Sequence, residues 1–344
     1  MRNSPATRRR LICSIALAII LLLTLPARAA GQTERRKLDM WTFRDLPYYE
    51  PLVSEPRAAR IELIIPAWAK EFPHSEEPGS RFAWQITLGR ELPIVGVRSE
   101  KLDGRVGKGQ WGLGLWTPVS FHVIEDFKDE SAPIVDTDYR FGGMLKFQYG
   151  LREDLWLGVK FVPWAHESTH LGDEYVIIAQ RDPAFKRVNP SFEYHEYGIS
   201  IEKVFGADRL QLTARHGGIN LWGEDGYYSD HLLGEDTRRL TPSEKNYEPS
   251  FGLEVRGRQF RGRHLFASVD ARHKLIYAFR RTAGEEEEKQ WSMKFAAGLA
   301  TPEATRGVPL KAIYLHYYRG VNPYGQLRAQ KDFWTVGVGW IFGL

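Results

Sequence analysis

Cysteine is almost absent from this chain of 344 residues, whose single cysteine is Cys13. Cys13 lies inside an apolar run near the N-terminus, and we expect it to be removed together with that run. The mature chain would then contain no thiol. This excludes disulfides, cysteine-ligated zinc and thiol nucleophiles.

A large excess of one charge is also missing, because 47 Lys and Arg stand against 43 Asp and Glu. The small positive excess lies at the start of the chain, where no acidic residue precedes Gly31. The rest of the chain is close to neutral, so we expect no nucleic-acid partner. The early basic residues are Arg2, Arg8, Arg9, Arg10 and Arg28.

Long apolar runs are missing after residue 30, and the one run before it is Leu11–Leu25. Basic residues precede this run, and Pro26 and the small residues around Arg28 follow it. A membrane-spanning helix needs roughly 20 apolar residues, so the run is short for an anchor. The pattern predicts a cleaved signal peptide over residues 1–29, with an uncleaved anchor as the alternative.

Apolar and polar residues alternate through most of the remaining chain. For example, Phe82, Trp84, Ile86 and Leu88 share one face of a strand pattern. About twelve such segments predict an all-β fold, a closed transmembrane antiparallel β-barrel of about 12 strands. A soluble β-sandwich also alternates, but Trp and Tyr recur near the segment ends, as in the aromatic belts of membrane barrels.

Charged residues of both signs fall on the face opposite the apolar one. Because they can pair across neighbouring strands, we expect a charge-filled lumen rather than an open pore. The residues predicted to point into the lumen are Arg140, Lys146, Lys160, Glu196, Glu202, Arg215, Glu254, Arg256, Asp270, Arg272 and Lys294.

The chain ends on the apolar strand pattern Phe333–Phe342, which we expect to pair with the first strand of the barrel. This end resembles the C-terminal signal of bacterial outer-membrane proteins, although Leu344 stands in place of a final Phe. The resemblance implies the bacterial cell outer membrane as location, with outer-membrane lipids and the barrel-assembly machinery as partners. We assign residues 30–56 to a periplasmic arm or plug segment and residues 57–344 to the barrel.

Three stretches lack the alternation. Leu221–Pro249 is predicted to be an external loop, and Gly284–Glu288 a solvated hairpin tip. Gly107–Gly112 fits G-x-G-x-x-G in letters, but a strand pattern follows it where a dinucleotide site needs a helix. We therefore expect a glycine-rich turn there.

The segment His166–Glu174, with the sequence HESTHLGDE, concentrates groups that can perform chemistry. If the strand that begins at Leu155 continues through it, His166, Ser168 and His170 share one face, about 7 Å apart in succession. His166 could then serve as general base for a Ser168 nucleophile, with His170 and the acidic residues at the segment's end assisting. Because these positions share parity with Lys160, the alternation predicts that they face the lumen; only a bulge at Pro163 would reverse this parity.

Two other interpretations of this segment stay open. Asp173 and Glu174 could bind a calcium ion together with backbone oxygens, since carboxylates and carbonyls are the ligands that calcium prefers. Alternatively, the histidines and Ser168 could bond to the backbone at a strand end and have a purely structural role.

This segment resembles motifs of two groups of bacterial proteins. The His-x-Ser pair on one strand is similar to the catalytic pair of outer-membrane phospholipase A and the lipid A deacylases, serine esterases whose pair faces lipid. The whole segment resembles the H-x-S-S-H-L-G-D-E motif of a family of exported bacterial proteins of unknown function, with Thr169 in place of a Ser. Tyr49–Arg57 and Tyr318–Gln326 resemble the two ends of that family. The family implies an outer-membrane location and no established activity.

Whether the chain is an enzyme is left open by its sequence. The first hypothesis is a lipid-directed acyl hydrolase that uses Ser168 as its nucleophile. The alternatives are a non-enzymatic envelope barrel and a narrow channel, and the paired lumen charges disfavour the channel.

Overall fold

The structure is a computed structural model, and the chain divides into two compact units, residues 1–37 and Leu38–Leu344. All described residues belong to the second unit, so the predicted signal peptide lies outside them. No helix among the described residues has both the length and the apolar composition needed to cross a membrane. The structure describes residues 38–43, 48–56, 58–70, 79–99, 105–127, 132–172, 188–206, 210–228, 247–260, 262–276, 289–301, 311–328 and 330–342.

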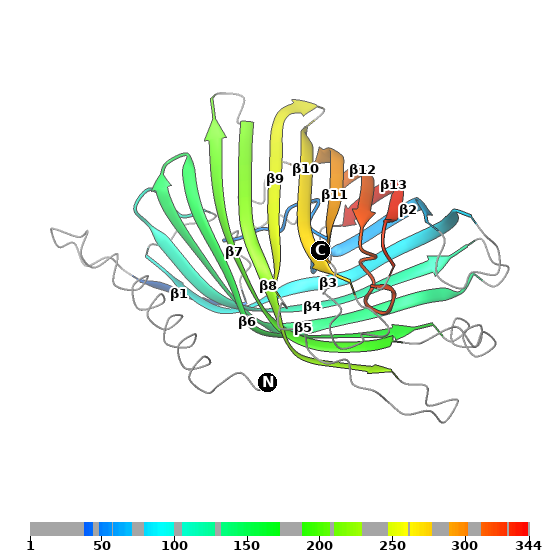
Figure 1. Cartoon of the computed structure of the whole chain (residues 1–344). Helices are drawn as coiled ribbons and strands as arrows, with labels where there is room; N and C mark the ends of the chain where they lie inside the picture. Colours follow the sequence, from blue (N-terminus) through cyan, green and yellow to red (C-terminus); the bar gives the residue numbers. More distant parts are fainter. Residues whose placement is uncertain are drawn as a thin grey trace. The chain divides into compact units, whose positions relative to one another are not determined.

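The described part of the second unit contains thirteen strands and one short 3-10 helix, η1 (Gly325–Leu327) (Figure 1). The strands are β1 (Asp39–Thr42), β2 (Ile61–Ala69), β3 (Arg81–Arg98), β4 (Trp111–Asp126), β5 (Ile134–Arg152), β6 (Leu155–Leu171), β7 (Val188–Phe205), β8 (Leu210–Tyr228), β9 (Tyr247–Phe260), β10 (Arg263–Leu275), β11 (Lys289–Ala300), β12 (Ala312–Gly320) and β13 (Phe333–Phe342).

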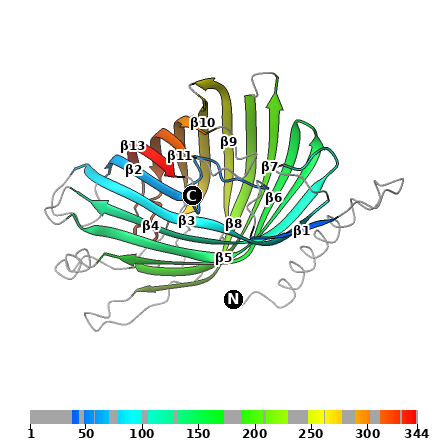
Figure 2. The same ribbon diagram turned by 180° about the vertical axis from the view of Figure 1, so that it is seen from behind.

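Twelve of these strands, β2 to β13, form a closed antiparallel ring. Each strand pairs with the next one along the chain, and the ring closes where β13 pairs with β2, with Trp340 opposite Leu63 (Figure 2). The short strand β1 lies outside this ring order and pairs with the last residues of β3, with Trp41 opposite Gly96. The closed barrel of about 12 strands and the pairing of the last strand with the first are therefore confirmed.

The two ends of the barrel carry different connections. Residues 153–154 join β5 to β6 at one end, which we call the turn end. Residues 229–246 join β8 to β9 at the opposite end, which we call the loop end. β8 continues to Tyr228 and β9 begins at Tyr247, so the prediction of a loop over all of Leu221–Pro249 was wrong. The hairpin tip predicted at Gly284–Glu288 lies outside the described residues.

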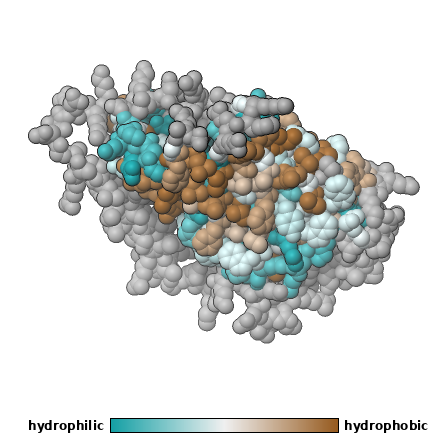
Figure 3. Space-filling model, turned by 90° about the horizontal axis from the view of Figure 1, so that it is seen from above, coloured by the Kyte–Doolittle hydropathy of each residue, from teal (hydrophilic) through white to brown (hydrophobic). Residues whose placement is uncertain are grey.

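The outer face of the barrel wall is apolar. Leu315 is 69% exposed, while its neighbours Tyr314 and His316 on the inner face are buried, and Ile201 is 52% exposed beside the buried Ser200. Figure 3 shows apolar side chains gathered in a band across one face of the molecule. In a soluble sandwich these residues would form the core, so the exposed apolar face argues against that alternative.

The inner face carries the charges, in agreement with the predicted charge-filled lumen. Lys160 donates to Glu196 at 2.9 Å, and Arg140 donates to the same carboxylate at 3.0 Å. Farther along the wall, Lys294 contacts Glu62 at 3.3 Å. Opposite charges thus compensate each other in a setting where an unpaired charge would be costly.

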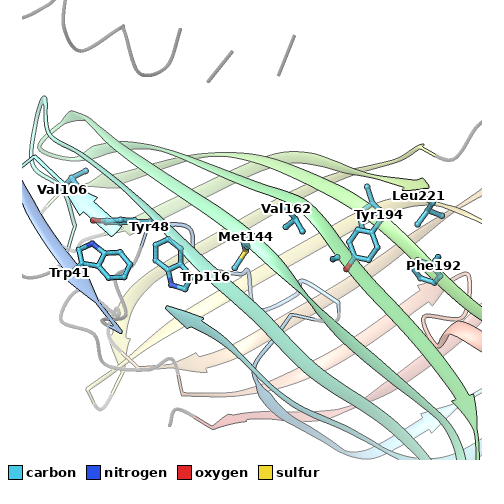
Figure 4. Packing of buried hydrophobic residues seen from close by; sticks show 11 residues of the cluster. Trp41, Tyr48, Val106, Trp116, Met144, Val162, Phe192, Tyr194 and Leu221 are labelled. Carbon is cyan, nitrogen blue, oxygen red and sulfur yellow. The ribbon is translucent and has the colours of Figure 1, made fainter. Parts of the chain in front are cut away.

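Residues 48–56 and 58–60, which we call the inner segment, lie against this inner face. The backbone N–H of Val53 donates to Glu254, and the hydroxyls of Ser54 and Ser268 lie 2.6 Å apart. Near the turn end, Tyr48 packs with Trp41 and Trp116 in an aromatic cluster (Figure 4). The inner segment therefore fills part of the space that the ring encloses.

Candidate functional site

The strand β6 changes its orientation halfway along its length. Up to Val162, even-numbered residues point inward, as Lys160 does. The pairing with β7 then shifts by one residue between Val162 and Ala165. Beyond the shift, odd-numbered side chains such as those of Ala165 and Glu167 are buried on the inner face. An extra residue in one strand of a pair is a β-bulge, and it exchanges the two faces of the strand that follows it.

The bulge falls at Pro163 and Trp164. Proline has no backbone N–H and so cannot donate to the strand ladder, which explains why the irregularity falls at this point. As a result His166, Ser168 and His170 lie on the outer face. The prediction that this group faces the lumen was wrong, because simple alternation does not count the extra residue. The prediction that the three share one face of one strand agrees with the structure.

Ser168 and His170 contact each other directly. The Ser168 Oγ lies 3.4 Å from the Nε2 of His170. This distance is long for a hydrogen bond. The two side chains are on the exposed surface, among the last residues of β6 before the loop end. The imidazole in contact with Ser168 is therefore that of His170, not the expected His166.

Aromatic rings of β5 contact the imidazoles of His166 and His170. Tyr139 lies opposite Ser168 in the β5–β6 register, and its ring meets that of His170 edge-on at 5.7 Å. Phe141 lies opposite His166, and the two ring centroids are 5.3 Å apart. Because Tyr139 and Phe141 are themselves exposed on the outer face, the site lies in an aromatic, apolar surface.

A carboxylate lies opposite His166 on the other side. In the β6–β7 register Glu193 faces His166, and its side chain is on the outer face between the buried Phe192 and Tyr194. Side chains directly opposite in an antiparallel pair have Cβ atoms about 5 Å apart. The sequence analysis missed Glu193, since only the interstrand register shows that it belongs beside this site.

The acidic end of the motif, Asp173 and Glu174, lies outside the described residues. The possible calcium site there stays a prediction. Among the described residues, no group of three or more His, Asp or Glu side chains could hold a metal ion.

The inner side of the same stretch is tied to the barrel interior. Thr169 donates from its hydroxyl to Asp136 at 3.1 Å, and the N–H of Gly325 donates to Asp138 at 3.2 Å. Gly325 begins η1, which contacts β5, β6 and β7. The outward residues of β6 therefore project from a wall that is supported from behind, which fixes their positions.

This arrangement can support nucleophilic catalysis. A serine hydroxyl and an imidazole in contact are the pair that acyl-transfer enzymes use, the imidazole taking the proton as the hydroxyl attacks a carbonyl. Because the pair lies on an exposed aromatic surface, its substrate would approach from outside the barrel and not through the lumen.

Comparison with solved structures finds several similar chains, all at low sequence identity. Outer membrane phospholipase A from Escherichia coli is similar at 11% identity and a TM-score of 0.43, over 85% of this chain and 93% of that one. The beta domain of the Bordetella autotransporter BrkA is similar at 7% identity and a TM-score of 0.39, over 83% of this chain and 100% of that one. OpdL of Pseudomonas aeruginosa shares 9% identity at a TM-score of 0.25, over 83% and 98%. At these values none of the resemblances assigns a function.

Comparison with the curated proteins finds no match. The family model described as "Protein of unknown function (DUF1207)" matches residues 32–219, which is more than half of the chain and includes β1 to β7 and the His166–Glu174 motif. The protein therefore belongs to this family of unknown function, DUF1207.

Proposed function

We propose that the protein is an outer-membrane β-barrel that hydrolyses acyl bonds of membrane lipids, with Ser168 as nucleophile and His170 as general base. The observation that carries the proposal is the contact between the Ser168 Oγ and the His170 Nε2 on the outer face. A serine–imidazole pair that faces lipid can reach an acyl carbonyl of a lipid and is poorly placed for a solute inside the barrel.

Membrane insertion is supported by the outer surface. Exposed aromatic pairs follow one another around the wall, with His216 stacked on Phe251 and His273 stacked on Trp291. Rings with one apolar and one polar side gather where acyl chains meet headgroups. In outer-membrane barrels the longer connections face outward, so the loop end, and with it Ser168, would lie at the outer leaflet. Residues 1–29 would direct export, and β13 would present the last strand to the assembly machinery.

The reaction would proceed in two steps. The Ser168 Oγ attacks the acyl carbonyl while its proton passes to the His170 Nε2, and the leaving alcohol takes that proton as the tetrahedral intermediate collapses. Water then attacks the acyl-enzyme with His170 again as base, and the fatty acid and free Ser168 are released. Asp173 and Glu174 follow His170 closely in the sequence, and one of them would orient the imidazole. His166, on the other side of Ser168, would stabilise the oxyanion.

Fatty-acid release by the purified protein in vesicles tests this proposal. One vesicle preparation contains phosphatidylethanolamine and a second also contains lipopolysaccharide, so that the two acyl sources are distinguished. Replacing Ser168 or His170 with Ala should lower the rate by about a thousandfold or more, since the two act as one unit. His166→Ala should have a smaller effect, of about tenfold to a hundredfold.

The matched control is His216→Ala, which removes another outward imidazole next to an aromatic ring and should keep the full rate. A fluorophosphonate probe should label Ser168 in the wild type and not in Ser168→Ala. If the wild type releases no fatty acid, or if Ser168→Ala is as active as the wild type, the hydrolase proposal fails. The non-enzymatic barrel would then be the better explanation.

A further inference from the structure

One cationic side chain lies on the apolar outer face in the middle of a strand. Arg90 of β3 is exposed between two exposed leucines, Leu88 at 50% and Leu92 at 42%. In the strand register it lies opposite Val119 of β4, which is also exposed. In the part of the chain that the structure describes, Arg90 makes no hydrogen bond and no ion pair. An apolar surface therefore surrounds a guanidinium that has no anionic partner among these residues.

The register with β4 places Arg90 well inside the apolar band of the wall. On the outer face of β4, Val119 lies between Glu125 toward the loop end and Trp111 at the turn end. These residues are about 20 and 26 Å from Val119 along the strand, at roughly 3.3 Å per residue. Strands of membrane barrels tilt by about 35–45° and their apolar band is about 25 Å tall, so Arg90 lies within that band. An arginine at such a depth destabilises a barrel unless something compensates its charge.

The backbone of β3 lacks a described neighbour on one side at the level of Arg90. β2 pairs with β3 only as far as Thr87, and the chain after β1 meets β3 again at Ile94. Between these points, Leu88–Pro93 pair with β4 and with no other described strand. Unpaired backbone N–H and C=O groups are costly in the hydrocarbon layer, so this edge also needs polar partners.

The inner side of this edge is covered by the protein itself. A Cβ added at Gly89 would lie 3.1 Å from the Cα of Ala59 in the inner segment. Glu91, the neighbour of Arg90 in the sequence, accepts from Lys146 at 2.5 Å and belongs to the interior ion pairs. A partner for Arg90 must therefore approach from outside the barrel.

We infer that Arg90 and the adjacent edge of β3 bind the phosphate of a phospholipid that is drawn into the bilayer from the leaflet at the turn end. The edge lies on the turn-end side of β2, which selects that leaflet. The guanidinium donates to the phosphate, the N–H groups of the edge donate to ester oxygens, and the acyl chains pack on Leu88 and Leu92. A phospholipid combines in one molecule the anionic, polar and apolar groups that this surface matches. The inference rests on the membrane insertion proposed above and not on the hydrolysis.

Fluorescence quenching by a lipid headgroup tests this inference. A bimane label is attached to Val119→Cys, next to Arg90, in the full-length chain with Cys13→Ser and Ser168→Ala, so that no lipid is hydrolysed. The vesicles contain phosphatidyl-tempocholine, whose quenching group is on the headgroup. The matched position is Ile199→Cys on β7, because Ile199 and Val119 are both 45% exposed on the apolar outer face. A bound phosphate brings a headgroup to Val119, so quenching there should exceed quenching at Ile199. A tempo-labelled diacylglycerol, which has no phosphate, should give no such excess.

Arg90→Gln should weaken binding by about tenfold or more, since it removes a charge-assisted hydrogen bond, and should remove the excess quenching at Val119. Arg90→Lys should keep most of the excess. The control is Arg319→Gln, which removes another exposed arginine of the outer face and should change nothing. Heat-modifiable gel mobility checks folding, and Arg90→Met replaces Arg90→Gln if the latter does not fold.

The outcomes separate this inference from the proposals on which it rests. Protein that does not float with the vesicles would refute membrane insertion itself. For inserted protein, the inference is overturned if the two labelled positions are quenched equally, as expected for a protein partner in place of a lipid. It is also overturned if Arg90→Gln keeps the excess, or if the diacylglycerol quenches as strongly as the phospholipid.

Discussion

The two halves of β6 belong to one continuous strand, yet they present opposite sets of residues to the lumen. In the half before Pro163, Lys160 points inward and joins the interior ion pairs. In the half after it, Glu167 points inward and Ser168 points outward. A single bulge therefore separates a stretch that serves the charged interior from one that offers reactive groups to the outside. Whether Ser168 points outward or inward depends on the number of residues at the bulge more than on the residue types beyond it.

Deleting Pro163 and Trp164 together should abolish this difference and have the largest effect. Ala165 then follows the inward Val162 directly, and regular alternation turns Ser168 inward and Glu167 outward. A carboxylate on the apolar face is destabilising, although by less than the roughly 2–4 kcal/mol of Arg or Lys at the bilayer midplane, and the buried bond from Thr169 to Asp136 is lost as well. We expect a barrel that folds poorly, measured as urea unfolding in lipid vesicles followed by tryptophan fluorescence.

The control for this deletion is Trp164→Ala, which keeps the residue count and removes the edge-on contact with Phe141. It should destabilise the barrel by only about 1 kcal/mol and leave the probe labelling of Ser168 intact. A deletion variant that folds as stably as the wild type and still exposes Ser168 would show that the bulge does not set the orientation.

The barrel itself could be predicted from the sequence, whereas the orientation of the site could not. Alternation in segments such as Phe82–Leu88 shows which face of a strand is apolar. This pattern can be recognised without knowing which strands pair with each other. A proline in a strand pattern permits a bulge without requiring one, so Pro163 alone does not fix the parity of Ser168. Likewise Glu193 lies beside His166 only because of the register between two strands.

The end of β8 shows a second limit of the alternation. Leu221–Tyr228 contains glycines and acidic residues without an apolar stripe, which led to the prediction of a loop, yet these residues continue the strand. Alternation arises where one face meets apolar surroundings and the other does not. A strand that extends beyond the apolar band needs no such pattern, so its hydrogen bonds to β7 leave little trace in the sequence.

The next comparison is between ion pairs inside and outside the barrel. Lys160→Met leaves Glu55 and Glu196 short of a shared cation in the interior, and losing one partner of a buried pair costs about 3–5 kcal/mol. Lys203→Met removes one of the two cationic partners of Asp154 at the turn end, the other being Arg152, and the side chains of Lys203 and Asp154 are both partly exposed. Such a pair contributes about 1 kcal/mol or less, so this variant should unfold at nearly the wild-type urea concentration.

If Lys160→Met and Lys203→Met lower the free energy of unfolding equally, the assignment of Lys160 to a desolvated interior network is contradicted. A double variant, Lys160→Met with Glu196→Gln, sharpens the comparison. It should recover part of the loss, since it removes one of the uncompensated carboxylates, and a double-mutant cycle measures that recovery.

A smaller effect than that of Lys160→Met is expected for the pH dependence of the contact between the inner segment and the wall. Burial disfavours the charged form of Glu55, but Lys160, Arg215 and Arg272 outweigh it and lower the pKa of this carboxyl to about 2. Because the pKa is depressed from 4.5 in the folded state, the stabilisation is complete well above pH 4.5 and is lost as the pH falls toward 2. Between pH 7 and pH 3 the linkage amounts to about 2 kcal/mol. The difference in unfolding free energy between the wild type and Glu55→Gln should shrink by that amount, and a difference independent of pH would show that the ion pairs of Glu55 do not hold the inner segment.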